Sequence, residues 1–131
     1  MSAGERPPEL IGTWRVVRWE DRDSEDEPWT PTLPAHVEGY AVYTEAGFWA
    51  VQLYAPPREG AEAFHFGYFG FGEAHDVRRE GGVVRGVLKV ESHGSSTPDA
   101  MTYNDRPFVI EGDSAVIGDG KTWVRAAERV R

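Results

Sequence analysis

Histidine, serine and cysteine are the residues whose spacing most often marks metal binding or nucleophilic catalysis. The chain has no cysteine, which excludes disulfides, thiolate metal sites and cysteine nucleophiles. None of its four histidines has the close spacing that metal ligands take on a helix or on alternate positions of a strand. Ser92 and His93 are neighbours in a predicted strand, so their side chains point to opposite faces and cannot pair as nucleophile and base. We expect no bound metal.

Two glycine-containing stretches fall short of nucleotide-binding motifs. Gly120-Lys121-Thr122 resembles the end of a phosphate-binding loop, but Ala115 stands where the first glycine belongs and a strand, not a helix, is predicted to follow. The run from Gly67 to Gly72 departs from the dinucleotide fingerprint in spacing and context. We therefore expect no cofactor.

Aromatic side chains are better candidates for a binding site. Tyr43, Trp49, Tyr54, Tyr68 and Trp123 all lie in predicted strands. Aromatic walls with a few polar tips suit a planar or polyene ligand. The alternative is that the same side chains simply fill a core, and the sequence leaves both interpretations open.

Arg18 is a candidate for the polar end of such a site. It shares the strand parity of Trp14, so its side chain can point inward. A buried arginine would need an anionic or carbonyl group, which a ligand can supply. The alternative is that Arg18 lies near the end of its strand and reaches solvent.

The elements that must position these side chains are short strands. Nine prolines and 15 glycines interrupt the chain. Between them, runs rich in Val, Phe, Tyr and Trp predict strands near residues 10–20, 39–45, 48–54, 63–78, 83–93, 106–111, 115–118 and 122–127. Glycine-containing turns join several neighbours. We predict an all-β fold, a single antiparallel up-and-down β-barrel of about eight strands, which can hold one small ligand.

Two hairpins can be registered from their turns. A three-residue loop at 45–47 places Tyr43 opposite Trp49 and points the odd-numbered side chains of this hairpin inward. A loop at 80–82 places Glu73 opposite Lys89 and points the even-numbered side chains of 64–74 inward, with Ser92 opposite Gly70. The predicted ligand-binding residues are Arg18, Tyr43, Trp49, Tyr54, Phe66, Tyr68, Leu88, Ser92 and Trp123.

The strand at 63–78 has an unusual composition on both faces. Gly70, Gly72 and Ala74 are small where a solid core would need large residues, so they either leave a cavity or let the strand bend sharply. Phe69 and Phe71 point outward in the same register. An outward aromatic pair predicts a homodimer interface, unless a flanking loop covers it.

Composition limits the partners and the compartment. The 131 residues predict one domain, residues 1–131, with an acidic, proline-rich loop at about 20–37. The formal net charge of −8 disfavours nucleic acid, because an acidic chain repels the phosphate backbone. No apolar run is long enough for a membrane helix, and residues 1–10 contain no apolar signal segment. We therefore expect a cytoplasmic protein that does not bind membranes.

Several motifs resemble a known family. Gly12-Thr13-Trp14 on the first predicted strand resembles the Gly-x-Trp signature of lipocalins and other calycins. The runs 39–44, 51–53 and 68–70 resemble, in their order and spacing, the bacterial lipocalin-like domain family. This resemblance implies a calycin-type barrel. It also implies that Trp14 packs under Arg125 of the last strand and closes one barrel end, a contact that a planar guanidinium favours.

These observations predict that the barrel binds a small hydrophobic or aromatic molecule. A first alternative, which the resemblance to calycin-like barrels implies, is a cofactor-independent cyclase or isomerase acting on a polyketide- or polyene-like substrate. Its hydrogen-bond donors would come from Tyr43, Tyr68, Ser92 and Arg18. A second alternative is an interaction module with a filled barrel. The sequence does not decide whether the protein is an enzyme.

Overall fold

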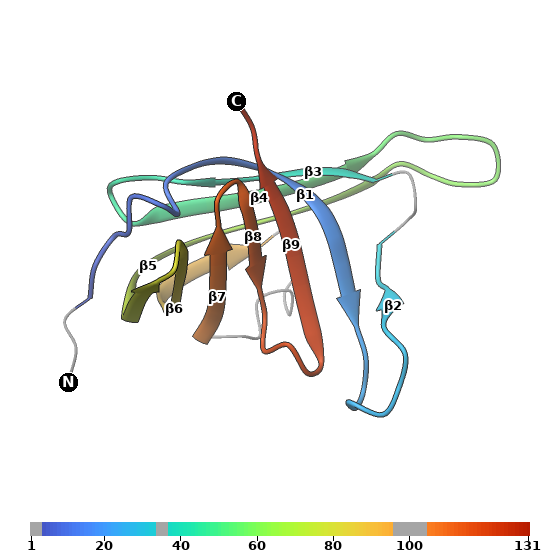
Figure 1. Cartoon of the computed structure of the whole chain (residues 1–131). Coiled ribbons are helices and arrows are strands. Elements are labelled where there is room, and N and C mark those ends of the chain that lie inside the picture. The colour runs from blue at the N-terminus through green and yellow to red at the C-terminus, as the bar shows by residue number, and fades with distance from the viewer. Residues whose placement is uncertain (1–3, 34–36, 96–104) are drawn as a thin grey trace.

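One antiparallel sheet closes on itself in the described residues 4–33, 37–95 and 105–131 of the computed structural model (Figure 1). Its strands are β1 (Gly12–Asp21), β2 (Thr30–Pro31), β3 (Glu38–Tyr43), β4 (Phe48–Ala55), β5 (Phe64–Glu80), β6 (Val83–Ser95), β7 (Asp105–Glu111), β8 (Ser114–Ile117) and β9 (Trp123–Arg129). Neighbours pair in the order β2-β1-β3-β4-β5-β6-β7-β8-β9, and β1 also pairs with β9. The predicted all-β class and eight-stranded antiparallel barrel are confirmed. The short edge strand β2 was not predicted.

The β3–β4 hairpin has the predicted register. Gly47 adopts a φ of 84°, a left-handed conformation that glycine takes without strain, and so closes the loop at 45–47. Tyr43 consequently lies opposite Trp49, and Ala41 lies opposite Val51. These four side chains are buried on the inner face, as the alternation of apolar residues predicted.

The β5–β6 hairpin has the predicted register at its centre, but its turn is shorter than predicted and a bulge compensates for the difference. Its turn has two residues, Gly81 and Gly82, rather than three. A bulge near Asp76, which has a φ of 55°, restores Glu73 opposite Lys89. A second irregularity next to Phe71 shifts the far end of the hairpin. Ser92 therefore lies opposite Phe71, not opposite Gly70 as predicted.

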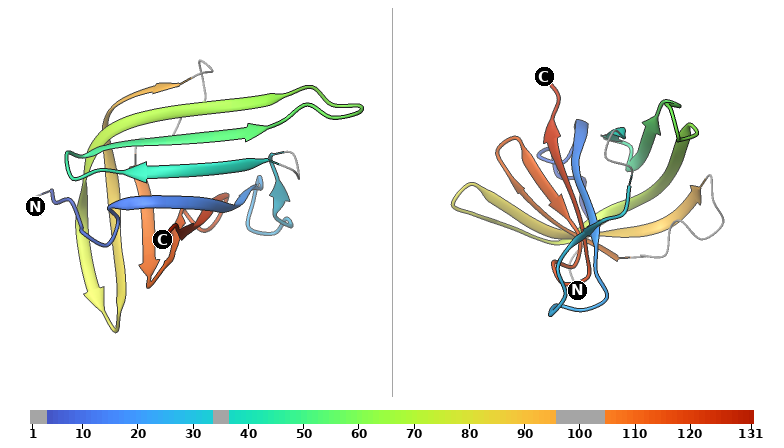
Figure 2. Two further views of the ribbon diagram at one scale, coloured as in Figure 1. Left: turned by 90° about the horizontal axis from the view of Figure 1, so that it is seen from above. Right: turned by 90° about the vertical axis from the view of Figure 1, so that its right-hand side faces the viewer.

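The small residues of β5 serve packing and curvature. β5 and β6 both bend sharply part-way along their length (Figure 2). At Gly70 a Cβ atom would lie 2.4 Å from the indole of Trp49, and at Gly72 it would lie 1.7 Å from the carbonyl oxygen of Lys89. Trp49 therefore occupies the room that Gly70 leaves, and Gly72 permits a close approach of two backbones. Of the two sequence interpretations, bending accounts for Gly72.

A bulge in β1 reverses the direction of Arg18. The pairing with β9 shifts between Val16 and Arg18, which leaves Val17 as the extra residue. Beyond this bulge Trp19 takes the inner face, and Arg18 is exposed, with its guanidinium bound to the carboxylate of Glu20. The prediction that Arg18 binds a ligand inside the barrel is wrong, because strand parity holds only along an unbroken strand.

The segment before β1 lies along β5. The backbone of Glu5 exchanges two hydrogen bonds with Ala74, each 2.8 Å long. This pairing uses the edge of β5 beyond Phe71, where its pairing with β4 ends. Arg79 then binds the carboxylates of Glu5 and Glu9. The N-terminal segment therefore adds a short piece of strand at the β5 bend.

The barrel interior holds one hydrophobic core. Its buried residues come from the N-terminal segment and from the strands of the barrel. Its largest fully buried side chains are Trp14, Trp49, Leu53 and Ile110. Among the described residues, no helix could span a membrane.

Two phenylalanines of β5 lie outside the barrel. Phe69 and Phe71 are 48% and 43% exposed, as the register predicted. Phe48 of β4 contacts both, with its ring centre 6.0 Å from that of Phe69 and 5.4 Å from that of Phe71. The three rings form an aromatic patch on the outer face.

Candidate ligand cavity

A cavity lies inside the barrel, between the first strands and the last. The empty space among its lining atoms, including its mouth, is about 420 Å³, of which about 30 Å³ admits the centre of a water molecule. That smaller volume corresponds to about two or three waters. A larger ligand would therefore have to displace side chains as it enters. The lining residues are Leu10, Trp14, Val16, Trp19, Ala41, Tyr43, Val51, Tyr68, Arg106, Ala115, Ile117, Arg125, Ala126 and Ala127.

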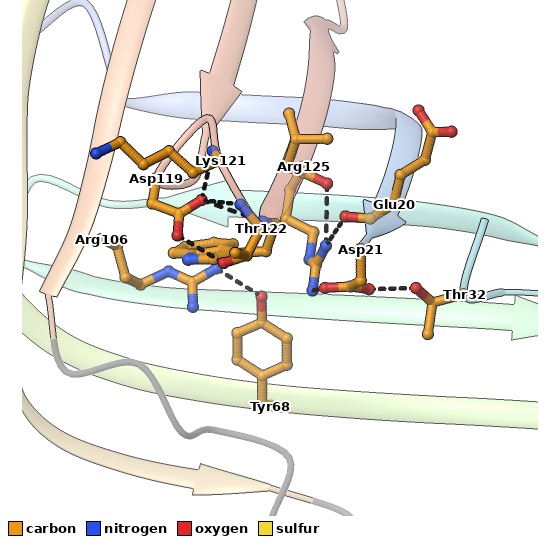
Figure 3. Close-up of polar contacts among 11 residues, drawn as sticks. Glu20, Asp21, Thr32, Tyr68, Arg106, Asp119, Lys121, Thr122 and Arg125 are labelled. Atoms are coloured by element: carbon orange, nitrogen blue, oxygen red, sulfur yellow. Dashed lines mark hydrogen bonds and ion pairs between the residues drawn. The ribbon is translucent and has the colours of Figure 1, made fainter. Parts of the chain in front are cut away.

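Arg106 of β7 places a positive charge on this cavity. It is 4% exposed, and its Nη2 donates a hydrogen bond of 3.1 Å to the hydroxyl of Tyr68 (Figure 3). Its guanidinium carbon lies 5.3 to 5.5 Å from the ring centres of Trp49, Tyr68 and Trp123. Aromatic faces attract a cation, and this attraction is stronger where water is excluded.

Sequence reasoning missed Arg106, although the signal was present. Phe108 and Ile110 are buried at alternate positions of β7, whereas Pro107 and Val109 between them are only half-buried. Arg106 has the same parity, so the period-two rule points it inward. The rule holds for β7 because its pairings with β6 and β8 contain no bulge. It failed for Arg18 because β1 does contain one.

Tyr43 adds a neutral polar group to the cavity wall. Burial raises the pKa of its phenol well above the usual range, although the positive charge of Arg106 partly opposes this shift. Tyr43 therefore stays protonated near neutral pH. It can donate a hydrogen bond there, but it cannot act as a general base.

Trp49 is buried beside Arg106 with an unused donor. Its indole Nε1 has no hydrogen-bond partner among the described residues, although Trp49 is only 1% exposed. A buried donor without a partner costs free energy, of the order of 1 to 3 kcal/mol. Trp49 also lines a second hollow, of about 280 Å³ empty space, beneath the N-terminal segment.

Arg125 also reaches the cavity, but it is held by an ion pair. Its Nη2 lies 2.9 Å from Oδ1 of Asp21, and its Nη1 donates to the carbonyls of Glu20 and Val124 (Figure 3). Its guanidinium carbon lies 4.3 Å from the ring centre of Trp19. This arrangement fixes Arg125 as part of the wall.

The contact between Trp14 and Arg125 that the resemblance implied is not formed. Trp14 lies opposite Arg129 in the β1–β9 pairing, and the guanidinium carbon of Arg129 is 4.2 Å from the Trp14 ring centre. The β1 bulge and the antiparallel pairing place Arg125 opposite Trp19 instead. The stacking of arginine on indole that closes the barrel is therefore present, but the arginine lies four residues further along β9.

The other predicted ligand-binding residues lie in several places. Tyr43 and Tyr68 line the cavity, Leu88 lines the second hollow, and Phe66 is half-buried against Trp19 and Tyr68. Tyr54 does not line the cavity, because it is 50% exposed on the even-numbered outer face of β4. Ser92 is described by its backbone alone.

The first half of the barrel has a counterpart among known families. Residues 11–69 match the lipocalin-like domain. This segment runs from the start of β1 into β5, so it contains Trp14, the β3–β4 hairpin and Tyr68. Comparisons with curated proteins and with solved structures found no match. The match confirms the resemblance over residues 11–69, and a lipocalin-like barrel is compatible with binding a ligand.

Among the described residues, no three histidine or acidic side chains gather where they could hold a metal ion. The polar groups that reach the cavity are instead Arg106, Tyr68, Tyr43 and the ion-paired Arg125. Such a set can donate hydrogen bonds to a ligand oxygen. It supplies no nucleophile paired with a base.

Proposed function

We propose that this protein binds a small hydrophobic or aromatic molecule inside its barrel. The observation that carries the proposal is an apolar interior cavity into which a buried arginine and its tyrosine partner project. Binding sites for small molecules combine apolar walls with a few convergent polar groups in this way. A ligand that fills the cavity would also bury its apolar surface, which contributes a favourable free energy of about 25 cal/mol per Å².

The narrow interior predicts how binding would be detected. Trp14 and Trp19 line the cavity, so an entering ligand would alter their surroundings and change the tryptophan fluorescence. We expect saturable changes on titration with hydrophobic fluorophores such as Nile red. An unchanged spectrum with every fluorophore of a panel would favour the filled-barrel interaction module.

A matched pair of variants locates the binding. Ala127→Leu adds three carbons to the cavity wall and should weaken fluorophore binding. Ala50→Leu adds the same atoms to the outer face, opposite Phe69, and should leave binding unchanged. Equal effects of the two substitutions would place the bound fluorophore outside the cavity.

A cyclase or isomerase activity in the same cavity is a second candidate. It is favoured by the neutral phenol of Tyr43 close to the charge of Arg106, because these donors could stabilise an enolate in a dry site. Its test is the molecule extracted from the purified protein. A cyclised product in the extract, which the protein also forms from the open precursor in vitro, would support catalysis, and a precursor recovered unchanged would support binding alone.

A further inference from the structure

We propose that the binding site continues out of the barrel between β1 and β3, and that the ligand is an elongated molecule with an uncharged apolar chain. The chain would lie in an outer groove, which is lined by residues 16–19 of β1 and by Pro31, Leu33 and Val37. The inference rests on the proposed binding function. It goes further by assigning a second part of the site and the shape of the ligand.

The sheet leaves an opening beside β1. β3 pairs with β1 as far as Arg15, and β2 pairs with it at Glu20 and Asp21. Between these two pairings β1 runs along β9 on one side, whereas on the other side it turns away from β3 (Figure 1). The amide of Thr32 donates to the carbonyl of Trp19, so the segment after β2 forms the far side of the opening. The outer groove lies at this opening.

The outer groove is roomier than the cavity inside the barrel. Its empty space is about 480 Å³, of which about 170 Å³ admits the centre of a water molecule, compared with about 30 Å³ in the cavity. A chain can therefore lie in the groove without displacing side chains, whereas the cavity admits a ligand only as its side chains move. These volumes favour a ligand with a narrow end inside the barrel and a longer part outside it.

Two side chains connect the outer groove with the cavity. Val16 and Trp19 line both spaces. Trp19 takes the inner face because of the bulge at Val17, and its ring centre lies 6.3 Å from that of Phe66 and 6.4 Å from that of Tyr68. The two spaces are therefore separated by side chains rather than by a hydrogen-bonded strand. A shift of Val16 or Trp19 joins them, which gives a ligand longer than the cavity a continuous path.

The walls of the outer groove suit a chain without charge. Val17 is 45% exposed, and Leu33 and Val37 pack against the core. The charge of Arg18 at the rim is compensated, because its guanidinium binds the carboxylate of Glu20. Exposed apolar surface that adjoins a cavity is typical of ligand-binding grooves. Burial of methylene groups there is favourable, whereas a charged group would lose hydration without gaining a free partner.

The test uses a series of uncharged probes that differ only in length. Binding of the linear alcohols from 1-hexanol to 1-decanol to the full chain is measured by isothermal titration calorimetry. Each buried methylene should raise the affinity about threefold to fourfold. If the chain continues into the outer groove, this increment should persist to 1-decanol. The comparison uses the wild-type protein, so it stands whether or not any variant folds.

Nuclear magnetic resonance of the methyl groups then locates the two ends of the probe. 1-Hexanol should shift the methyl signals of Val51 and Ala127, which line the cavity. 1-Decanol should shift these signals and also those of Val17 and Leu33, which line the outer groove.

A matched pair of variants assigns the increment to the outer groove. Val17→Ser removes apolar surface from the groove, so it should reduce the gain between 1-hexanol and 1-decanol and leave the affinity for 1-hexanol unchanged. Val116→Ser makes the same change at a similarly exposed position of β8 and should leave the whole series unchanged. A melting curve for each variant verifies folding.

The outcomes separate this inference from the function on which it rests. If the affinity stops rising within the series and the Val17 and Leu33 signals do not move, the outer part of the site is refuted while binding in the barrel stands. Equal effects of Val17→Ser and Val116→Ser would also overturn it. Movement of the groove signals without those of Val51 and Ala127 would refute the continuity of the two spaces. If neither the alcohols nor the hydrophobic fluorophores bind, this inference and the proposed function both fail.

Discussion

Arg129 stacks on Trp14 across the seam where the last strand of the barrel joins the first. The two residues are direct partners in the β1–β9 pairing, with 4.2 Å between the guanidinium carbon and the ring centre. Arg129 also donates to the carbonyls of Glu9 and Ile11, so a single side chain joins β9, β1 and the N-terminal segment. This one contact ties the closure of the barrel to the segment that precedes it.

A double-mutant cycle tests this closure. Trp14→Phe combined with Arg129→Met should show a coupling of about 1 kcal/mol in urea unfolding, because the stacked pair is partly shielded from water. The matched cycle of Trp14→Phe with Arg125→Met should show a coupling near zero. A larger coupling free energy for Trp14 with Arg125 than with Arg129 would indicate that Trp14 contacts Arg125, and would contradict the β1–β9 register.

The bend in β5 depends on Gly72. A Cβ atom there would overlap the backbone carbonyl of Lys89, which no side-chain rotation relieves. We expect Gly72→Ala to lower the free energy of unfolding by about 3 kcal/mol. Gly67→Ala on the same strand would meet only the flexible amide of Gln52, and is expected to cost less than about 1 kcal/mol. Equal losses in chemical denaturation would show that the bend tolerates a side chain at Gly72.

Asp119 orders the turn between β8 and β9. Partial loss of hydration opposes ionisation, but hydrogen bonds from the Thr122 hydroxyl and from the amides of Lys121, Thr122 and Trp123 lower the pKa of Asp119 to about 2 (Figure 3). A pKa that is lower in the folded state makes the ionised carboxylate stabilising. Its contribution is complete above the unfolded pKa of about 4 and is lost as the pH falls towards 2.

The stability difference between wild type and Asp119→Asn should therefore be largest at pH 5 to 7. Because Asp119 is exposed, we expect about 1 kcal/mol there, shrinking steadily between about pH 4 and 2. Asp23→Asn makes the same change in charge within the acidic loop and serves as the control. A difference that is independent of pH, measured by urea unfolding, would assign the effect to the shape of the turn alone.

The aromatic patch on the outer face keeps the prediction of a homodimer open to test. The outward positions of Phe69 and Phe71 are confirmed, whereas the dimer itself stays a prediction. If the patch forms the interface, Phe71→Glu should convert a dimer into a monomer in light scattering, since a buried carboxylate without a partner is costly. Val116→Glu changes a similarly exposed residue on β8 and should leave the mass unchanged. A wild-type protein with the mass of a single chain would refute the dimer.

The fold could be predicted from the sequence where local rules act. Gly47 set the length of the β3–β4 loop, and that length set the register of Tyr43 with Trp49. The alternation of side chains along β7 would also have predicted that Arg106 points inward, because it has the parity of Phe108 and Ile110. The same rule gave the wrong direction for Arg18, because a bulge at Val17 interrupts β1. Val17 is an ordinary strand residue, so nothing in the sequence indicates the bulge. The partner of Trp14 could not be deduced either, since the closing register depends on that bulge.

The central claim is that a small molecule occupies the barrel, and native mass spectrometry of the protein as purified tests it most directly. We expect an added mass that disappears on denaturation, and a small hydrophobic or aromatic compound in the extract. The Ala127→Leu variant should carry less of it, because the added side chain narrows the cavity. A protein that shows only the mass of its chain, yields no compound on extraction and takes up no aromatic probe would contradict the claim.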